Sequence, residues 1–297
     1  MRTTNRNTAA ALASSEALPQ PVREFEFSDA DFRDLAQFAY SQAGIALADS
    51  KRNLVYSRLS RRLRTLGMST FREYRDYLAA NEAELEAFIN AISTNLTKFF
   101  REVHHFDHLR THVAAHFGQT GYRSAGGRLR IWSAGCSTGE EPYTIAAVLT
   151  REIRNIERYD VKILATDIDT EVLSKGMRGE YPAESLAEVP TMYREYFPSS
   201  GASRKSGHIV MGDKLRSLIT FRRLNLMEPW PFSGLFDAIF CRNVMIYFDG
   251  PTKTTLVERF TRQIKPEGWL YIGHSESLLG LHPGLELVGR TIYRREA

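Results

Sequence analysis

The chain has 297 residues, of which 43% are hydrophobic and 25% are charged, a composition ordinary for a globular protein. It excludes wholesale disorder, a collagen-like repeat and a coiled-coil rod, and no apolar run approaches the length that spans a membrane. The cysteines, Cys136 and Cys241, are too few for a disulfide framework, and the net charge of +4 matters only if positive side chains cluster.

The first third of the sequence predicts a leader followed by a small helical domain. Residues 1–22 are rich in Ala, Thr, Ser and Asn and predict a disordered leader; they lack the apolar core of a secretory signal, so a cytoplasmic location is expected. Residues 23–95 then predict an all-helical domain, because apolar side chains recur at spacings of three and four. Its predicted helices cover residues 28–43, 54–66, 71–78 and 82–94.

From Gly126 onward, strands and helices alternate. This alternation predicts an α/β domain over residues 96–297, in which a doubly wound parallel sheet carries helices on both faces. The predicted strands are residues 128–133, 161–166, 236–240 and 269–272, and the predicted helices include 141–153 and 252–264. Residues 285–294 are expected to add an antiparallel edge strand.

One stretch interrupts the alternation. Residues 177–222 are rich in Gly and Pro and contain short candidate strands at 208–211 and 217–222. Because short strands between turn-forming residues are typical of antiparallel sheets, we expect a small inserted β-subdomain here.

The loop Gly135-Cys-Ser-Thr-Gly139 lies between a predicted strand and a predicted helix. Glycines let the backbone turn sharply and let a ligand approach the main chain. Asp167 ends the next strand, where a nucleotide-type site places the acid that holds ribose hydroxyls. The loop lacks the middle glycine of a dinucleotide site and the Lys of a phosphate-binding loop. S-adenosylmethionine, which has no phosphate, therefore fits best.

The same loop has the G-x-S-x-G spacing of a hydrolase nucleophile elbow, with Ser137 as the nucleophile. Acids (Asp237, Asp249) and then His274 follow in the order that such hydrolases use. Against this alternative, Ser137 follows the first strand of the α/β unit, and Asp167 would have no role. A plain tight turn without a ligand is a third interpretation.

Polar residues elsewhere are expected to reach the same cleft, since ligands of doubly wound sheets lie beyond the carboxyl ends of the strands. Asn243 and Tyr247 follow the predicted strand 236–240, and Asn225 follows another. Residues 94–102 join the two domains and place Arg101 near a buried junction, where a guanidinium needs an anionic partner. The Asn/Asp-Pro-Pro-Tyr tetrad of enzymes that methylate base amines is absent.

Basic residues cluster in the second predicted helix, between Lys51 and Arg64, without an intervening acid. This helix packs with one face and presents positive charge with the other, either as a solvated surface or as a docking surface for an acidic partner. Histidines recur every four residues from His104 to His116, but no Cys or Glu pattern completes a metal site, so we expect a surface stripe and no metal.

Together, these segments resemble the CheR family of chemotaxis receptor glutamate methyltransferases. The motifs that carry the resemblance lie at 95–102, 132–143, 166–173, 236–249 and 273–277, and the similarity covers about residues 28–293. It implies an all-α N-terminal domain and a class I S-adenosylmethionine-dependent methyltransferase domain with an inserted β-subdomain. It also implies transfer of the methyl group to receptor glutamates, with S-adenosylhomocysteine as the product.

The resemblance also implies roles for individual residues. Arg101 and Tyr247 match the positions that orient the substrate, and the basic helix, through Arg58, Arg61 and Arg62, is expected to meet the receptor's cytoplasmic helices. The cofactor-binding positions match Asn95, Thr97, Arg101, Glu140 or its neighbour Glu141, Asp167, Asn225, Leu226, Asn243 and Val244.

Some members of the family bind a receptor's C-terminal peptide through the β-subdomain, which makes that peptide a further expected partner. Neither nucleic acid nor direct membrane insertion is expected. A nucleic-acid methyltransferase and a scaffold that binds no cofactor remain alternatives.

Overall fold

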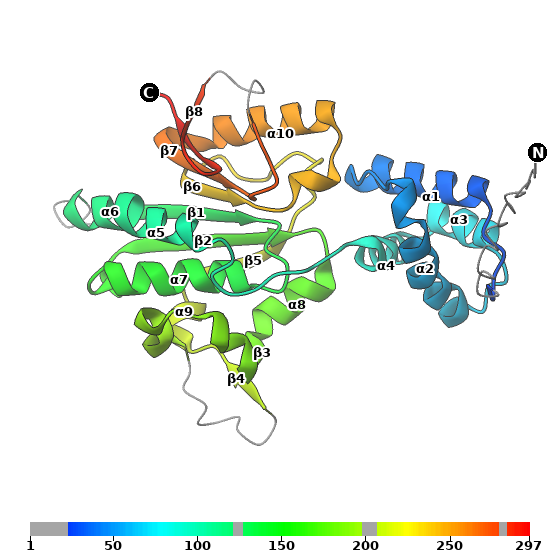
Figure 1. The fold of residues 1–297 in the computed structure, drawn as a ribbon, viewed down its shortest axis with the longest axis horizontal. Helices are drawn as coiled ribbons and strands as arrows, with labels where there is room; N and C mark the ends of the chain where they lie inside the picture. The colour runs from blue at the N-terminus through cyan, green and yellow to red at the C-terminus, as the bar shows by residue number, and fades with distance from the viewer. Residues whose placement is uncertain (1–22, 121–126, 198–206, 279–283) are drawn as a thin grey trace, which may run out of the picture.

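The computed structural model describes residues 23–120, 127–197, 207–278 and 284–297, and the predicted leader lies outside them. A helical domain lies beside an α/β domain, and the linker of residues 93–98 connects them (Figure 1). In the described part of the chain, no helix is long and apolar enough to cross a membrane.

The helical domain consists of α1 (Asp29–Ala43), α2 (Arg52–Leu66), α3 (Phe71–Ala80) and α4 (Glu82–Ile92). Local signals set these bounds: Ser28 and Thr70 cap α1 and α3 through capping boxes, and Gly44 and Gly67 end α1 and α2 in the left-handed conformation. The four predicted helices are confirmed, although α4 ends at Ile92 rather than Thr94. The apolar faces meet in a core of their own, around Leu59, Tyr74 and Phe88.

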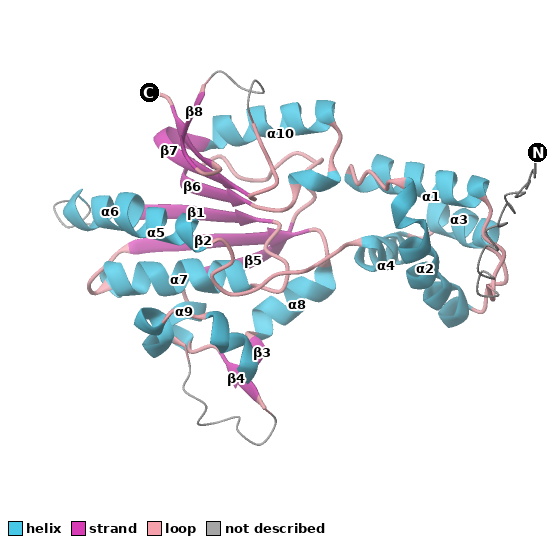
Figure 2. Ribbon diagram, viewed as in Figure 1, coloured by secondary structure: helices cyan, strands magenta, loops and turns pink. Residues whose placement is uncertain are grey.

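The α/β domain is built on a seven-stranded sheet with the order β5-β2-β1-β6-β7-β9-β8 (Figure 2). Strands β2, β1, β6 and β7 are parallel, as the alternation predicts, and β5 adds a further parallel strand beside β2. The strands are β1 (Arg128–Ala134), β2 (Asp160–Asp167), β5 (Ile219–Arg223), β6 (Phe236–Cys241), β7 (Ile264–Ile272), β8 (Leu285–Gly289) and β9 (Ile292–Arg295).

Helices cover both faces of this sheet. Ile131 and Trp132 are neighbours on β1, yet they belong to two different cores, because successive side chains of a strand point to opposite faces. The first core contains α5 (Val103–His108) and α7 (Glu140–Glu152), and the second contains α10 (Gly250–Gln263). Figure 1 shows α7 and α10 on opposite sides of the strands.

Two strand predictions need correction. The predicted strand 217–222 is not part of the inserted subdomain: β5 lies in the main sheet, parallel to β2, where Phe221 packs against Gly176 of α8 (Thr170–Arg178). The subdomain sheet is antiparallel, as expected, but the partner of β4 (His208–Val210) is β3 (Glu180–Pro182), a strand that was not predicted. The single expected strand at 285–294 is a hairpin, of which only β9 pairs with β7.

The histidines do not form a simple surface stripe. His105 is fully buried, and the helix widens into a π-helical turn over Leu109–Ala114. The ring of His112, within this turn, stacks on the ring of His108 with centroids 4.0 Å apart. Burial lowers the pKa of His105 to about 3 and that of His108 to about 4, so both rings are uncharged at neutral pH. Among the described residues, no group of three His, Cys, Asp or Glu could hold a metal ion.

Candidate active site

The Gly135–Gly139 loop turns the chain from β1 into α7 at the carboxyl end of the sheet. Gly135 has a φ of 79°, and a Cβ there would lie 2.3 Å from Cγ2 of Val244. This close approach joins the loop to the segment that follows β6. The amides of Gly135 and Cys136 donate to the carbonyl of Thr166, at 2.8 and 2.9 Å, so the loop is also fixed to the end of β2.

Asp167 ends β2 and is held by the amides around it. Its Oδ2 accepts a hydrogen bond from the amide of Ser137 at 2.8 Å, and its Oδ1 accepts one from the amide of Asp169 at 3.0 Å. Burial raises the pKa of Asp167 to about 6. Each carboxylate oxygen has a second lone pair, so the group can accept two further hydrogen bonds from neighbouring hydroxyls.

The two glutamates at the start of α7 face different surroundings. Glu140 accepts a hydrogen bond from Thr138 Oγ1 at 2.6 Å and does not line the cleft. Glu141 lines the cleft and accepts hydrogen bonds from Ser133 Oγ at 2.6 Å and from Nη1 of Arg242 at 2.9 Å. Burial raises the pKa of both carboxyl groups. The structure therefore places Glu141, rather than Glu140, in the cleft.

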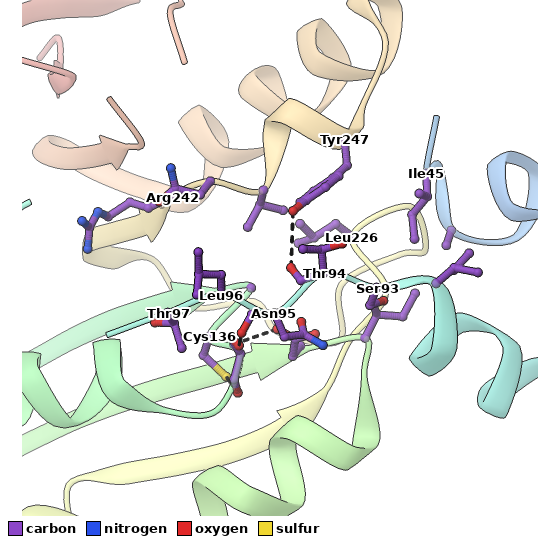
Figure 3. Close-up of a pocket in the computed structure, with 18 of the residues that line it drawn as sticks. Ile45, Ser93, Thr94, Asn95, Leu96, Thr97, Cys136, Leu226, Arg242 and Tyr247 are labelled. Atoms are coloured by element: carbon purple, nitrogen blue, oxygen red, sulfur yellow. Dashed lines mark hydrogen bonds between the residues drawn. The ribbon is translucent and has the colours of Figure 1, made fainter. Parts of the chain in front are cut away.

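The linker lies across the carboxyl ends of the strands and is held from both sides. Asn95 Nδ2 donates to Asp169 at 2.7 Å, and the carbonyl of Asn95 accepts from Ser137 Oγ at 3.3 Å. The Tyr247 hydroxyl points toward the linker and donates to the carbonyl of Thr94 at 3.3 Å (Figure 3). Arg101 donates to the carbonyl of Leu96 at 2.8 Å.

After β6, the chain turns through Asn243, which has a φ of 59°. A buried carboxylate supports this turn: Glu276 accepts hydrogen bonds from the amides of Asn243, Ile246 and Gly273 at 3.0, 3.1 and 2.6 Å. Sequence reasoning assigned Glu276 no role, although it lies in the 273–277 motif. Its effect is to hold the Asn243–Tyr247 segment against the end of β7.

These segments enclose one cleft at the carboxyl ends of β1, β2 and β6. The structure brings together nearly all of the site residues expected from the sequence, and Figure 3 shows Tyr247 facing the linker residues Thr94 and Asn95. The expected residues that line the cleft are Asn95, Thr97, Arg101, Asp167, Asn225, Leu226, Asn243, Val244 and Tyr247.

The helical domain also contributes to this cleft, which sequence reasoning missed. The segment Ile45–Leu47, between α1 and α2, lines one side of it. The amide of Ala46 donates to the carbonyl of Tyr247 at 2.8 Å, and Asn225 Nδ2 donates to the carbonyl of Gln42 at 2.8 Å. Apolar residues in a loop give no sequence signal for such a contact, because the contact depends on how the two domains pack.

The structure contradicts the hydrolase alternative. His274 Nδ1 contacts Glu102 at 3.0 Å, whereas the Ser137 hydroxyl donates to the linker. The two candidate acids are also engaged elsewhere: Asp237 accepts from Lys265 at 2.6 Å, and Asp249 caps α10. Among the residues that the structure describes, Ser137 therefore has neither the base nor the orienting acid that a nucleophilic serine requires.

Two of the three basic residues expected to dock a partner have structural roles in the helical domain. Arg58 donates to the carbonyls of Ala91 and Ser93 at the end of α4, at 3.0 and 2.5 Å. Arg62 makes a bidentate pair with the buried Glu84, at 2.9 and 2.6 Å. Arg61 is exposed and forms no ion pair with any residue that the structure describes.

The sequence matches two family models that together cover most of the chain. Residues 30–93 match the all-alpha domain of CheR methyltransferases, and residues 95–293 match their S-adenosylmethionine-binding domain. With the cleft at the carboxyl ends of a parallel sheet, these matches define an S-adenosylmethionine-dependent methyltransferase. The chain belongs to the CheR methyltransferase family.

Curated relatives agree over nearly their full length. The chain is 44% identical over 283 residues to chemotaxis protein methyltransferase 2 of Pseudomonas aeruginosa, covering 93% of this chain and 97% of the relative. It is 43% identical over 281 residues to the chemotaxis protein methyltransferase of Escherichia coli, covering 93% and 94%. A probable chemotaxis protein methyltransferase of Rhizobium etli is 45% identical over 259 residues, covering 86% and 96%.

The structural role of Arg62 leads to a stability prediction. Arg62→Ala leaves the carboxylate of Glu84 buried without its guanidinium, so we expect the free energy of unfolding to fall by about 2 kcal/mol. Arg61→Ala removes an exposed side chain of the same helix and should change the free energy of unfolding by less than about 0.5 kcal/mol. Urea denaturation followed by circular dichroism measures both. Equal stability of the two variants would contradict the role assigned to the Arg62–Glu84 pair.

Proposed function

We propose that this chain transfers the methyl group of S-adenosylmethionine to glutamate side chains of chemotaxis receptors and forms glutamate γ-methyl esters. The observation that carries the proposal is that Arg101 and Tyr247 line the same cleft as Asp167. A group that pairs with a carboxylate thus lies in one site with a group suited to a ribose. Membership of the CheR methyltransferase family supports the same conclusion.

The side chains of the cleft fit the cofactor. Asp167 would hold the ribose hydroxyls through its spare lone pairs, and Glu141 would face the methionine ammonium group. Arg242 also lines the cleft, and its Nε is buried with no hydrogen-bond partner among the described residues, which suits the methionine carboxylate. Asn95, Asn225 and Val244 would complete the walls. When bound, the cofactor supplies a methyl group on a positively charged sulfur.

The acceptor needs no general base. A glutamate carboxyl group titrates near ~4.3, so it is ionised at neutral pH and can attack directly. The positive sulfonium and the negative carboxylate neutralise each other as the new bond forms, so a site that excludes water favours the transition state over separated, hydrated ions. The role left to the protein is to align the acceptor with the transferred methyl group.

Arg101 and Tyr247 are suited to that alignment. The Arg101 guanidinium can pair with one carboxylate oxygen and leave the other free to attack. A strong pair would also stabilise the reactant, so we assign Arg101 an orienting role rather than a role in charge stabilisation. The Tyr247 hydroxyl, which now donates to Thr94, can donate to the acceptor from the opposite wall of the cleft.

We place the receptor's cytoplasmic helices against the exposed face of α2, with Arg61 as the main contact and Arg58 and Arg62 as supports of that helix. The methylation of such helices implies that the protein acts in the cytoplasm. We also place a receptor's C-terminal peptide on the β3–β4 sheet, because an extended segment can add to the edge of a small sheet. Fluorescence polarisation with that labelled peptide tests this second contact.

Arg101→Ala should lower kcat by about 100-fold, because the acceptor loses its alignment with the methyl group. Tyr247→Phe should lower kcat by about tenfold, as expected when one hydrogen bond to the acceptor is lost. Transfer of labelled methyl groups to receptor-containing membranes measures both. Unchanged turnover of the Arg101→Ala variant, with its fold intact by circular dichroism, would refute the orienting role.

Cofactor affinity should depend on pH through Asp167, whose pKa of about 6 lies above the usual range. Below that pKa, the protonated group loses acceptor capacity, so affinity for S-adenosylhomocysteine should fall by up to about tenfold between pH 8 and pH 5. Asp167→Asn should bind more weakly at pH 8 and should lack this pH-dependent loss. Calorimetry at a series of pH values measures both, and an equal pH dependence in the two proteins would show that another group is responsible.

Arg61→Glu should raise the KM for receptor about tenfold and leave both kcat and the affinity for S-adenosylhomocysteine unchanged, because Arg61 lies on a surface away from the cleft. The effect should shrink at high salt, where charge attraction is screened. Methylation rates at increasing receptor concentration measure it. A KM equal to that of the unmodified protein would show that α2 is not the docking surface.

A further inference from the structure

Arg101 lies in a backbone turn that its own residue types do not favour. The residues on either side of it, Phe100 and Glu102, have φ values of 53° and 60°, in the left-handed region that favours glycine. Surrounding contacts must therefore hold this turn in place. On one side they are clear: the Phe100 ring stacks on Tyr193 with centroids 4.9 Å apart, and its amide donates to Thr144 Oγ1 at 3.2 Å.

On the other side, the turn is held by the carboxylate of Glu102. Its Oε1 accepts hydrogen bonds from the backbone amide of His274 at 3.2 Å and from the His274 ring at 3.0 Å. Its Oε2 lies 3.3 Å from the Arg242 guanidinium and 3.5 Å from Nδ1 of His105. One carboxylate thus joins the start of α5 to the segments that follow β6 and β7.

Arg242 closes this arrangement around Arg101. Its guanidinium, with a side chain only 2% exposed, contacts Glu141 at 2.9 Å and donates to the backbone carbonyl of Arg101. Two carboxylates therefore share one buried guanidinium. The side chain of Arg101 lies at the edge of this cluster, with Nε 4.0 Å from Oε1 of Glu102.

We infer that Glu102 is a positioning residue for Arg101: it fixes the turn that presents the Arg101 guanidinium to the methyl acceptor. The inference rests on the proposed function of Arg101. Glu102 itself does not line the cleft, so it can act on the reaction only through its neighbours. Although burial opposes ionisation, Arg242 and His274 hold the pKa of Glu102 at about 2, so the carboxylate is charged throughout the physiological range.

The test is the substitution Glu102→Gln, which keeps the shape and removes the charge. We expect kcat to fall between about tenfold and about 100-fold, as for a small displacement of an aligning group. The KM for S-adenosylmethionine and the affinity for S-adenosylhomocysteine should stay within about twofold, because Arg242, the cleft residue that Glu102 contacts, keeps its pair with Glu141. Glu258→Gln is the matched control: it neutralises a partly exposed carboxylate that pairs with Arg262 on α10, outside the cleft, and it should leave the rate unchanged.

A double-mutant cycle separates positioning from a general structural effect. If Glu102 acts through Arg101, Glu102→Gln should reduce kcat less than about twofold in the Arg101→Ala background, although it reduces kcat strongly alone. Additive effects in the double variant would overturn the inference. So would a loss of cofactor affinity that accounts for the whole effect of Glu102→Gln.

A second variant keeps the inference testable if the Glu102→Gln protein does not fold. His274→Gln removes one partner of the carboxylate from a side chain that is 68% exposed, and we expect a loss in kcat of about threefold with an unchanged melting temperature. If kcat is unchanged in both variants while the unmodified protein methylates receptor, the inference about Glu102 is overturned and the proposed function stands. An unmodified protein that binds S-adenosylhomocysteine but methylates no receptor would instead refute the proposed function.

Discussion

The active-site cleft depends on how the interdomain linker is held across the carboxyl ends of β1, β2 and β6. Hydrogen bonds reach the linker from both walls, from Ser137 and to Asp169 on one side and from Tyr247 on the other. Because the linker is fixed at several points, Arg101 and Asp167 line a common cleft although they belong to distant parts of the sequence. A displaced linker would separate the group suited to the acceptor from the group suited to the cofactor.

The helical domain also helps to hold the segments that form the cleft in place. Besides carrying the basic surface of α2, it supplies the Ile45–Leu47 wall and binds the backbone of Tyr247 through Ala46. Asn90 of α4 also bonds with Thr170, the first residue of α8, through its side chain at 3.0 Å. A receptor helix docked on this domain would therefore contact a unit that is hydrogen-bonded to the backbone of Tyr247 in the cleft.

Local signals predicted much of this fold from the sequence. Periodicity and glycine caps set α1 and α2 within two residues, because those helix bounds depend on neighbouring residues. The strand 217–222 was assigned to the wrong sheet, since its pattern does not encode which strand it pairs with. The hairpin of β8 and β9 was missed for a local reason: its turn places Thr291 at a φ of 56°, a conformation for which threonine gives no sequence signal.

The candidate site also divides into residues that local spacing predicts and residues whose position depends on packing between distant segments. Asp167 and the glycine loop were predictable from their spacing, because the carboxyl ends of parallel strands share one edge. The sequence could not show which of the neighbours Glu140 and Glu141 lies in the cleft. Glu141 lines the cleft and Glu140 bonds with Thr138, and this difference depends on how α7 packs. Glu276 and Glu102 also escaped assignment, because each stabilises the backbone of another segment and gives no spacing signal.

The most direct test of the account is methyl transfer from labelled S-adenosylmethionine to purified receptor cytoplasmic fragments, followed by treatment with mild base. The account predicts label that base releases as methanol, since a γ-methyl ester hydrolyses readily, and no label on fragments whose acceptor glutamates are replaced by alanine. Label that resists base, or label that persists on the substituted fragments, would contradict transfer to a glutamate carboxylate.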